Sequence, residues 1–129
     1  MFNRRALQIV LLVLSLIPLA FGILGLVFGA GRISGGAAVA AELDSQFRYL
    51  SGWYFSLAML CWWIAPRIER ETTVFRIVCA AVFLGGIGRL VSLSAVGQPP
   101  AMMLGALALE LGVPLLVVWQ AQVAKSAAA

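Results

Sequence analysis

The sequence predicts an all-α membrane protein: a four-transmembrane-helix bundle with both termini cytoplasmic. Of the 129 residues, 63% are hydrophobic and only 11% are charged, whereas a soluble domain is about 45–50% apolar and about 25% charged. The apolar residues gather in four long stretches that are separated by polar or glycine- and proline-containing segments. This composition excludes a disordered chain, a nucleic-acid-binding arm and a water-soluble enzyme domain.

Four spans nearly fill the chain, because a membrane helix needs about 20 apolar residues. We therefore expect a single membrane domain over residues 1–129. Its helices are expected at about residues 6–30, 45–65, 73–96 and 101–124.

The first stretch, residues 6–30, carries no charge and follows Arg4 and Arg5. Its apolar core is longer than the roughly 7–15 residues of a signal peptide, so we expect an uncleaved spanning helix. Residues 31–47 form the longest connection. Its glycines break the helix, and its second half suits a short helix at the membrane surface.

The second span covers Tyr49–Ala65 and reaches full length if Asp44 or Ser45 is its N-cap. Aromatic residues lie at both of its ends, which is typical of a span anchored at two interfaces, and Pro66 ends it.

The third and fourth spans are joined by a tight, uncharged GQPP turn at residues 97–100. We expect Thr72 or Thr73 to cap the third helix. Pro114 lies inside the fourth and has no N–H, so the carbonyl of Glu110 should lose its helical partner.

Basic residues set the orientation, since cytoplasmic loops carry an excess of Lys and Arg. Arg32 and Arg48 lie on one side of the predicted bundle. The opposite, cytoplasmic side holds more of them: Arg4, Arg5, Arg67, Arg70, Arg76 and Lys125.

Arg89 and Glu110 are the most informative charged residues, because both lie inside apolar spans. Each is about ten residues from the GQPP turn, which places both roughly 15 Å deep. A charge at that depth costs at least about 2.5–3.5 kcal/mol, and two opposite charges at one level offset much of this. The pair is either a salt bridge that fixes two helices or a site that binds a ligand or handles a proton.

Asp44 and Arg48 share a helix face because they are spaced i,i+4. Taken singly, they fit an N-cap and an arginine that reaches the membrane interface. If their face meets Arg89, an outward-opening polar pocket results. The polar cluster would comprise Asp44, Arg48, Tyr54, Arg89, Ser92 and Glu110.

Several glycines are expected to let helices approach closely, namely Gly25, Gly29, Gly52, Gly85 and Gly86. No metal site and no cofactor are expected, because the chain has no histidine and its carboxylates are not spaced as metal ligands. Cys61 and Cys79 are expected to be small buried hydrophobes.

The motifs LDSQFRYLSGWYFSLAML, RIER, FLGGIGRLVSL, VGQPP and LALELGVPLLVVW occur in this order over roughly residues 40–120. In this combination the chain resembles the DUF4345 family of small bacterial membrane proteins. The resemblance implies a membrane fold and a bacterial inner (cytoplasmic) membrane, and it supplies no reaction. The positions that match the family pattern are Asp44, Arg48, Gly52, Tyr54, Gly85, Gly86, Arg89, Gly97, Pro99, Pro100 and Glu110.

These observations favour a non-enzymatic integral membrane protein, with the lipid bilayer as its surroundings and no nucleic acid as partner. It would bind an apolar or amphipathic ligand, or serve as an accessory subunit of a larger membrane complex, with the polar cluster setting its specificity. The first alternative is a small proton-coupled transporter that acts as a dimer, a homo-oligomer in which Glu110 is the proton carrier. The second is a membrane enzyme that acts on lipid or isoprenoid substrates.

Overall fold

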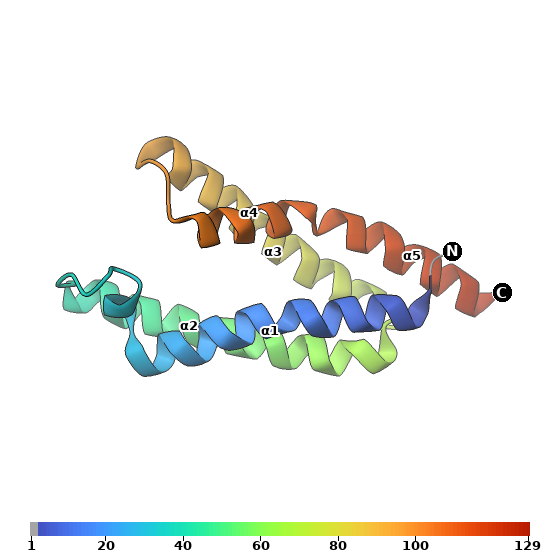
Figure 1. Cartoon of the computed structure of the whole chain (residues 1–129). Coiled ribbons are helices and arrows are strands. Elements are labelled where there is room, and N and C mark those ends of the chain that lie inside the picture. Colours follow the sequence, from blue (N-terminus) through green and yellow to red (C-terminus); the bar gives the residue numbers. More distant parts are fainter. Residues whose placement is uncertain (1–2) are drawn as a thin grey trace. The chain divides into compact units, whose positions relative to one another are not determined.

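The computed structural model describes residues 3–129, in which every regular element is a helix, so the predicted all-α class is confirmed. Two short 3-10 turns, η1 (Ala30–Arg32) and η2 (Ala65–Arg67), flank the second long helix. The long helices, drawn in Figure 1, are α1 (Arg4–Phe28), α2 (Ala41–Ile64), α3 (Thr72–Ala95), α4 (Ala101–Gly112) and α5 (Pro114–Ala128).

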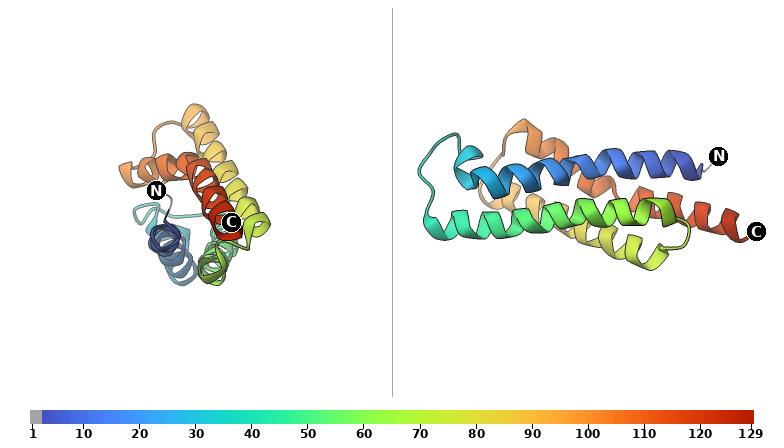
Figure 2. Two further views of the ribbon diagram at one scale, coloured as in Figure 1. Left: turned by 90° about the vertical axis from the view of Figure 1, so that its right-hand side faces the viewer. Right: turned by 90° about the horizontal axis from the view of Figure 1, so that it is seen from below.

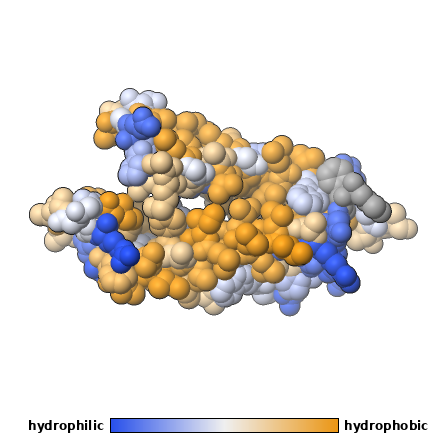
Figure 3. All heavy atoms as spheres, viewed as in Figure 1, coloured by the Kyte–Doolittle hydropathy of each residue, from blue (hydrophilic) through white to orange (hydrophobic). Residues whose placement is uncertain are grey.

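Three segments of the described chain are long and apolar enough to cross a membrane: Arg4–Phe28, Thr72–Ala95 and Ala101–Ala128. The fourth expected span, α2, has 24 residues like α3, but its tyrosines, tryptophans and serines make it less hydrophobic. Figure 3 shows hydrophobic residues covering the helices and hydrophilic ones gathered toward the helix ends, as expected for helices that lie in lipid.

The chain divides into two compact units. One comprises Gln8–Pro66 and holds most of α1 together with α2. The other comprises the described residues up to Leu7 together with Arg67–Ala129, and it holds α3, α4 and α5. The expectation of a single domain stays a prediction.

In the unit of Gln8–Pro66, α1 and α2 run antiparallel and side by side, as two views of Figure 2 show. Near one end, the Gln8 Nε2 atom donates to the carbonyl oxygen of Ala65 over 2.8 Å. Further along, the Trp62 Nε1 atom donates to the Ser15 hydroxyl over 2.9 Å. Such hydrogen bonds between helices join their polar groups where no water is available.

Two glycines of α1 permit the close approach of α2. A Cβ atom at Gly22 would lie 2.6 Å from the main-chain nitrogen of Phe55. A Cβ atom at Gly25 would collide with the hydroxyl of Ser51. Contacts between α1 and α2 thus continue from Gln8 almost to the end of α1.

In the other unit, α3 packs against both α4 and α5. Its fully buried side chains include Phe75, Ile68 and Gln120. The Gln120 Nε2 atom donates to the Ile68 carbonyl oxygen at 2.8 Å and to the Thr72 hydroxyl at 2.9 Å. This amide joins α5 to the beginning of α3.

Two expectations about helix starts are wrong. Helix α2 begins at Ala41, so neither Asp44 nor Ser45 is its N-cap. From Ala41 onward, the residues expected to form a short surface helix belong to α2. Helix α3 has Glu71 at the N-cap position, without a side-chain cap. At Pro114 the fourth stretch divides into α4 and α5.

The Glu110 carbonyl is not left without a partner at this break. The Val113 N–H donates to it over 3.4 Å, because a tighter 3-10 type bond replaces the one that Pro114 cannot make. The carbonyl therefore does not face the site as a free acceptor.

Candidate functional site

Arg89 on α3 and Glu110 on α4 form an ion pair. The Arg89 Nε atom lies 2.8 Å from Glu110 Oε2 and 3.0 Å from Oε1. The side chains are 32% and 16% exposed, respectively. They lie at similar distances from the 97–100 turn, which brings them to about one level, because the turn reverses the chain between two antiparallel helices.

Gly86 makes room for this pair. A Cβ atom at position 86 would lie 3.1 Å from the Cβ atom of Glu110 and 3.3 Å from Leu111 Cδ2. The absence of a side chain therefore lets α4 approach α3 at the level of the carboxylate. Arg89 lies three residues further on, so it reaches the same carboxylate from the next turn.

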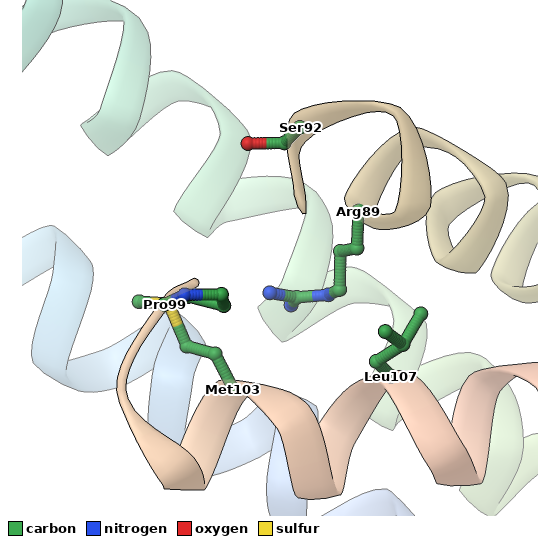
Figure 4. Close-up of a pocket in the computed structure, with 5 residues that line it drawn as sticks. All are labelled: Arg89, Ser92, Pro99, Met103 and Leu107. Atoms are coloured by element: carbon green, nitrogen blue, oxygen red, sulfur yellow. The ribbon is translucent and has the colours of Figure 1, made fainter. Parts of the chain in front are cut away.

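A small open pocket of about 70 Å³ lies beside this pair. Figure 4 shows the Arg89 side chain reaching from α3 toward α4, with its guanidinium directed toward Pro99 and Met103. Ser92 lies one turn further along α3. The walls are mainly apolar, and the complete lining is Arg89, Ser92, Pro99, Met103 and Leu107.

Asp44 and Arg48 form a second ion pair, in which Arg48 Nε lies 2.8 Å from Asp44 Oδ2. The other carboxylate oxygen of Asp44 accepts the Ala30 N–H over 2.8 Å. The Arg48 Nη1 atom donates to the carbonyl oxygens of Leu26 and Val27. The pair therefore caps the end of α1 and the beginning of η1 from the side of α2.

The hydrogen bonds of this cap favour the charged form of the Asp44 carboxyl. The hydrogen bond from Arg48, followed by that from the Ala30 N–H, lowers the pKa of the Asp44 carboxyl below its ordinary value of 3.8. A guanidinium at the last carbonyls of a helix also complements the helix dipole. Gly29 separates α1 from η1 with a φ of 67°, and a side chain there would collide with Asp44.

The predicted polar cluster is divided between the two units. Asp44, Arg48 and Tyr54 lie on α2, whereas Arg89, Ser92 and Glu110 lie on α3 and α4. Tyr54 is 39% exposed and lies ten residues after Asp44, which is about 15 Å along the helix. A single pocket that contains both ion pairs stays a prediction.

The glycines have different roles. Gly25 and Gly86 lie where another helix approaches, and Gly29 forms the end of α1. Gly52 and Gly85 have no heavy atom of the described chain within 4 Å of their Cβ positions, so the packing role predicted for them is not realised within their units.

Sequence reasoning missed several residues of these sites. Met103 and Leu107 line the pocket, and their i,i+4 spacing on the helix facing Arg89 is the signal that could have found them. Gln120 is fully buried, and an amide within an apolar stretch indicates a bond to another helix. The expected burial of Cys61 and Cys79 is observed.

Within residues 3–129 there is no group of three or more His, Cys, Asp or Glu side chains that could hold a metal ion. The family model described as "Domain of unknown function (DUF4345)" matches residues 6–121. No curated protein and no solved structure matches the chain.

Proposed function

Because the chain belongs to the DUF4345 family, a domain of unknown function, we propose its role from its own residues. It is an integral membrane protein that binds an amphipathic ligand at the Arg89 pocket. The observation that carries this proposal is a charged guanidinium directed into a pocket whose other walls are mainly apolar.

We propose that four spans cross the bacterial inner membrane, namely α1, α2, α3 and the stretch formed by α4 and α5, with both termini in the cytoplasm. That α2 crosses the membrane is inferred from its packing against α1. Helix α1 is long and apolar enough to span, and α2 lies against it from Ala65, beside Gln8, to Ser51, beside Gly25. A helix paired with a spanning helix over this length occupies the same depths. The distribution of arginines supports the orientation.

The pocket is suited to one end of a longer molecule. Its volume of about 70 Å³ is far below the roughly 300–1,000 Å³ of a site that encloses a drug-sized ligand. The pocket reaches Pro99 in the turn that joins α3 and α4. A polar end group can therefore bind beside Arg89 while an apolar chain extends over the hydrophobic helix surface.

The ion pair disfavours the transporter alternative. Both carboxylate oxygens of Glu110 accept from Arg89 Nε, so a proton carried by Glu110 would have to displace this bond in every cycle. The enzyme alternative has no additional group in its favour, since Arg89 and Ser92 are the polar residues among the five that line the pocket.

Native mass spectrometry of the protein extracted gently from its original membrane tests the proposal. We expect a retained amphipathic molecule, and we expect Met103→Trp to displace it by filling the pocket. Met102→Trp is the matched control, because Met102 is the preceding residue and is 63% exposed.

Retention that is unaffected by Met103→Trp would contradict binding at this pocket. A second polypeptide at fixed stoichiometry, with no small molecule, would instead favour the role of an accessory subunit.

A further inference from the structure

The chemistry of the Arg89 pocket restricts what the polar end of the ligand can be. Glu110 occupies the Nε atom of Arg89. Within the described residues, the two Nη atoms have no hydrogen-bond partner, and they are directed into the pocket (Figure 4). A guanidinium has only donors, so the ligand has to present acceptors to its outer edge.

The outer edge of a guanidinium carries two parallel N–H donors. This arrangement matches the paired oxygens of a carboxylate or a phosphate, and such charge-assisted bonds are about twice as strong as bonds between neutral groups. The other polar group of the lining, the Ser92 hydroxyl, can also donate. No lining residue carries a negative charge.

Glu110 is a positioning residue that orients the Arg89 guanidinium. Its carboxylate bonds to the Nε edge, at a distance of 2.8 Å, and so leaves the Nη edge turned toward the pocket. Gly86 permits this arrangement, because a Cβ atom at position 86 would require Glu110 and Leu111 on α4 to move away from α3. The negative charge of Glu110 also weakens the attraction of Arg89 for a second anion, so removing this charge should strengthen anion binding.

We propose that the Arg89 pocket binds the oxyanion headgroup, a phosphate or a carboxylate, of a single-chain amphiphile. The inference rests on the proposed amphiphile-binding function and adds the headgroup class. The Nη1 and Nη2 atoms of Arg89 bind two headgroup oxygens, Pro99, Met103 and Leu107 contact the first part of the chain, and Glu110 orients the guanidinium.

The test is a binding series on the full-length protein in neutral phosphatidylcholine nanodiscs. The probes share one alkyl chain and differ in headgroup: dodecyl phosphate, dodecanoate, dodecanol and dodecyltrimethylammonium. Inorganic phosphate is the probe without a chain. We expect the two oxyanions to bind at least about tenfold more tightly than dodecanol, and dodecyl phosphate to bind more tightly than inorganic phosphate.

Three variants assign the effect to the site. Arg89→Lys keeps the charge but loses the paired donors, so it should weaken dodecyl phosphate binding about tenfold or more. Glu110→Gln keeps an acceptor for Nε and removes the competing charge. It should strengthen dodecyl phosphate binding relative to dodecanol binding, because the competing charge acts on a charged headgroup. Met103→Trp should abolish binding of every alkyl probe.

The outcomes separate the two proposals. Equal binding of all four alkyl probes, lost in Met103→Trp, would overturn the headgroup assignment and keep the amphiphile site. No binding of any alkyl probe would overturn both. Binding of inorganic phosphate as tight as that of dodecyl phosphate would overturn the amphiphile in both proposals and would leave only an oxyanion site at Arg89.

Discussion

Gly86 on α3 and Glu110 on α4 lie in direct contact, such that a Cβ atom at position 86 would lie 3.1 Å from the Cβ atom of Glu110. The close approach brings the Glu110 carboxylate within 2.8 Å of Arg89 Nε. Helix packing and charge pairing are therefore coupled at this level of the membrane, so a change in one should be measurable in the other.

Gly86→Ala should weaken both the packing and the ion pair. The added methyl group requires Glu110 and Leu111 to move by a few tenths of an ångström, and strain of this kind typically costs about 1–3 kcal/mol. The measurement is the unfolding midpoint in mixed detergent. Gly85→Ala is the matched control, since nothing of the described chain lies within 4 Å of that position. Equal effects of the two variants would contradict this account.

Glu110→Leu should destabilise the protein by roughly 2.5–3.5 kcal/mol, because it leaves the Arg89 charge unpaired within an apolar span. The double variant Arg89→Leu/Glu110→Leu should be closer to the wild type in stability, since it leaves no charge behind. Both are compared by reversible unfolding in detergent. The single variant Arg89→Leu completes the comparison. If the loss of unfolding free energy in the double variant equalled the sum of the losses in the two single variants, the charges would act independently.

The Asp44 cap should be sensitive to acid only well below neutral pH. The hydrogen bonds from Arg48 and the Ala30 N–H place the pKa of folded Asp44 below 3.8. Their stabilising effect is therefore present above about pH 4 and is lost as the pH falls through the lowered pKa. Hydrogen exchange of the segment containing Ala30, corrected for the intrinsic rate, should be constant from pH 7 to 5 and accelerate below pH 4.

Asp44→Asn should accelerate exchange of the same segment already at pH 7, because the bond to Arg48 loses its charge. Glu42→Gln is the control, since Glu42 is an exposed carboxylate in the same first turn of α2. An identical response of both variants would show that net charge, and not the cap, governs this segment.

Gln120→Leu should destabilise the attachment of α5 to α3. The substitution removes the donors to the Ile68 carbonyl and the Thr72 hydroxyl, and a buried polar group left without its partner costs about 1–3 kcal/mol. Thermal unfolding in detergent measures the loss. Gln122→Leu, two residues further along α5 and not fully buried, should change stability much less.

The helices and their places in the chain follow from the amino-acid sequence alone. Long apolar stretches without charges can be satisfied in lipid only as helices, because every main-chain polar group needs a partner. The Arg89–Glu110 pair also follows from the sequence, since two residues at similar distances from one tight turn meet when the chain reverses. The helix ends were less predictable: α2 begins at Ala41 because residues outside the apolar stretch continue the helix.

The contacts of the charged residues depend on how the helices pack. The Asp44 and Arg48 pair follows from i,i+4 spacing, but its bonds to Ala30, Leu26 and Val27 depend on how α1 ends beside α2. Whether a glycine permits a close approach depends on the facing helix, which is why Gly86 lies against Glu110 whereas no heavy atom among residues 3–129 lies within 4 Å of a Cβ at Gly85. Local periodicity specifies which residues share a face, whereas the partner of that face is set by packing between segments distant in the chain.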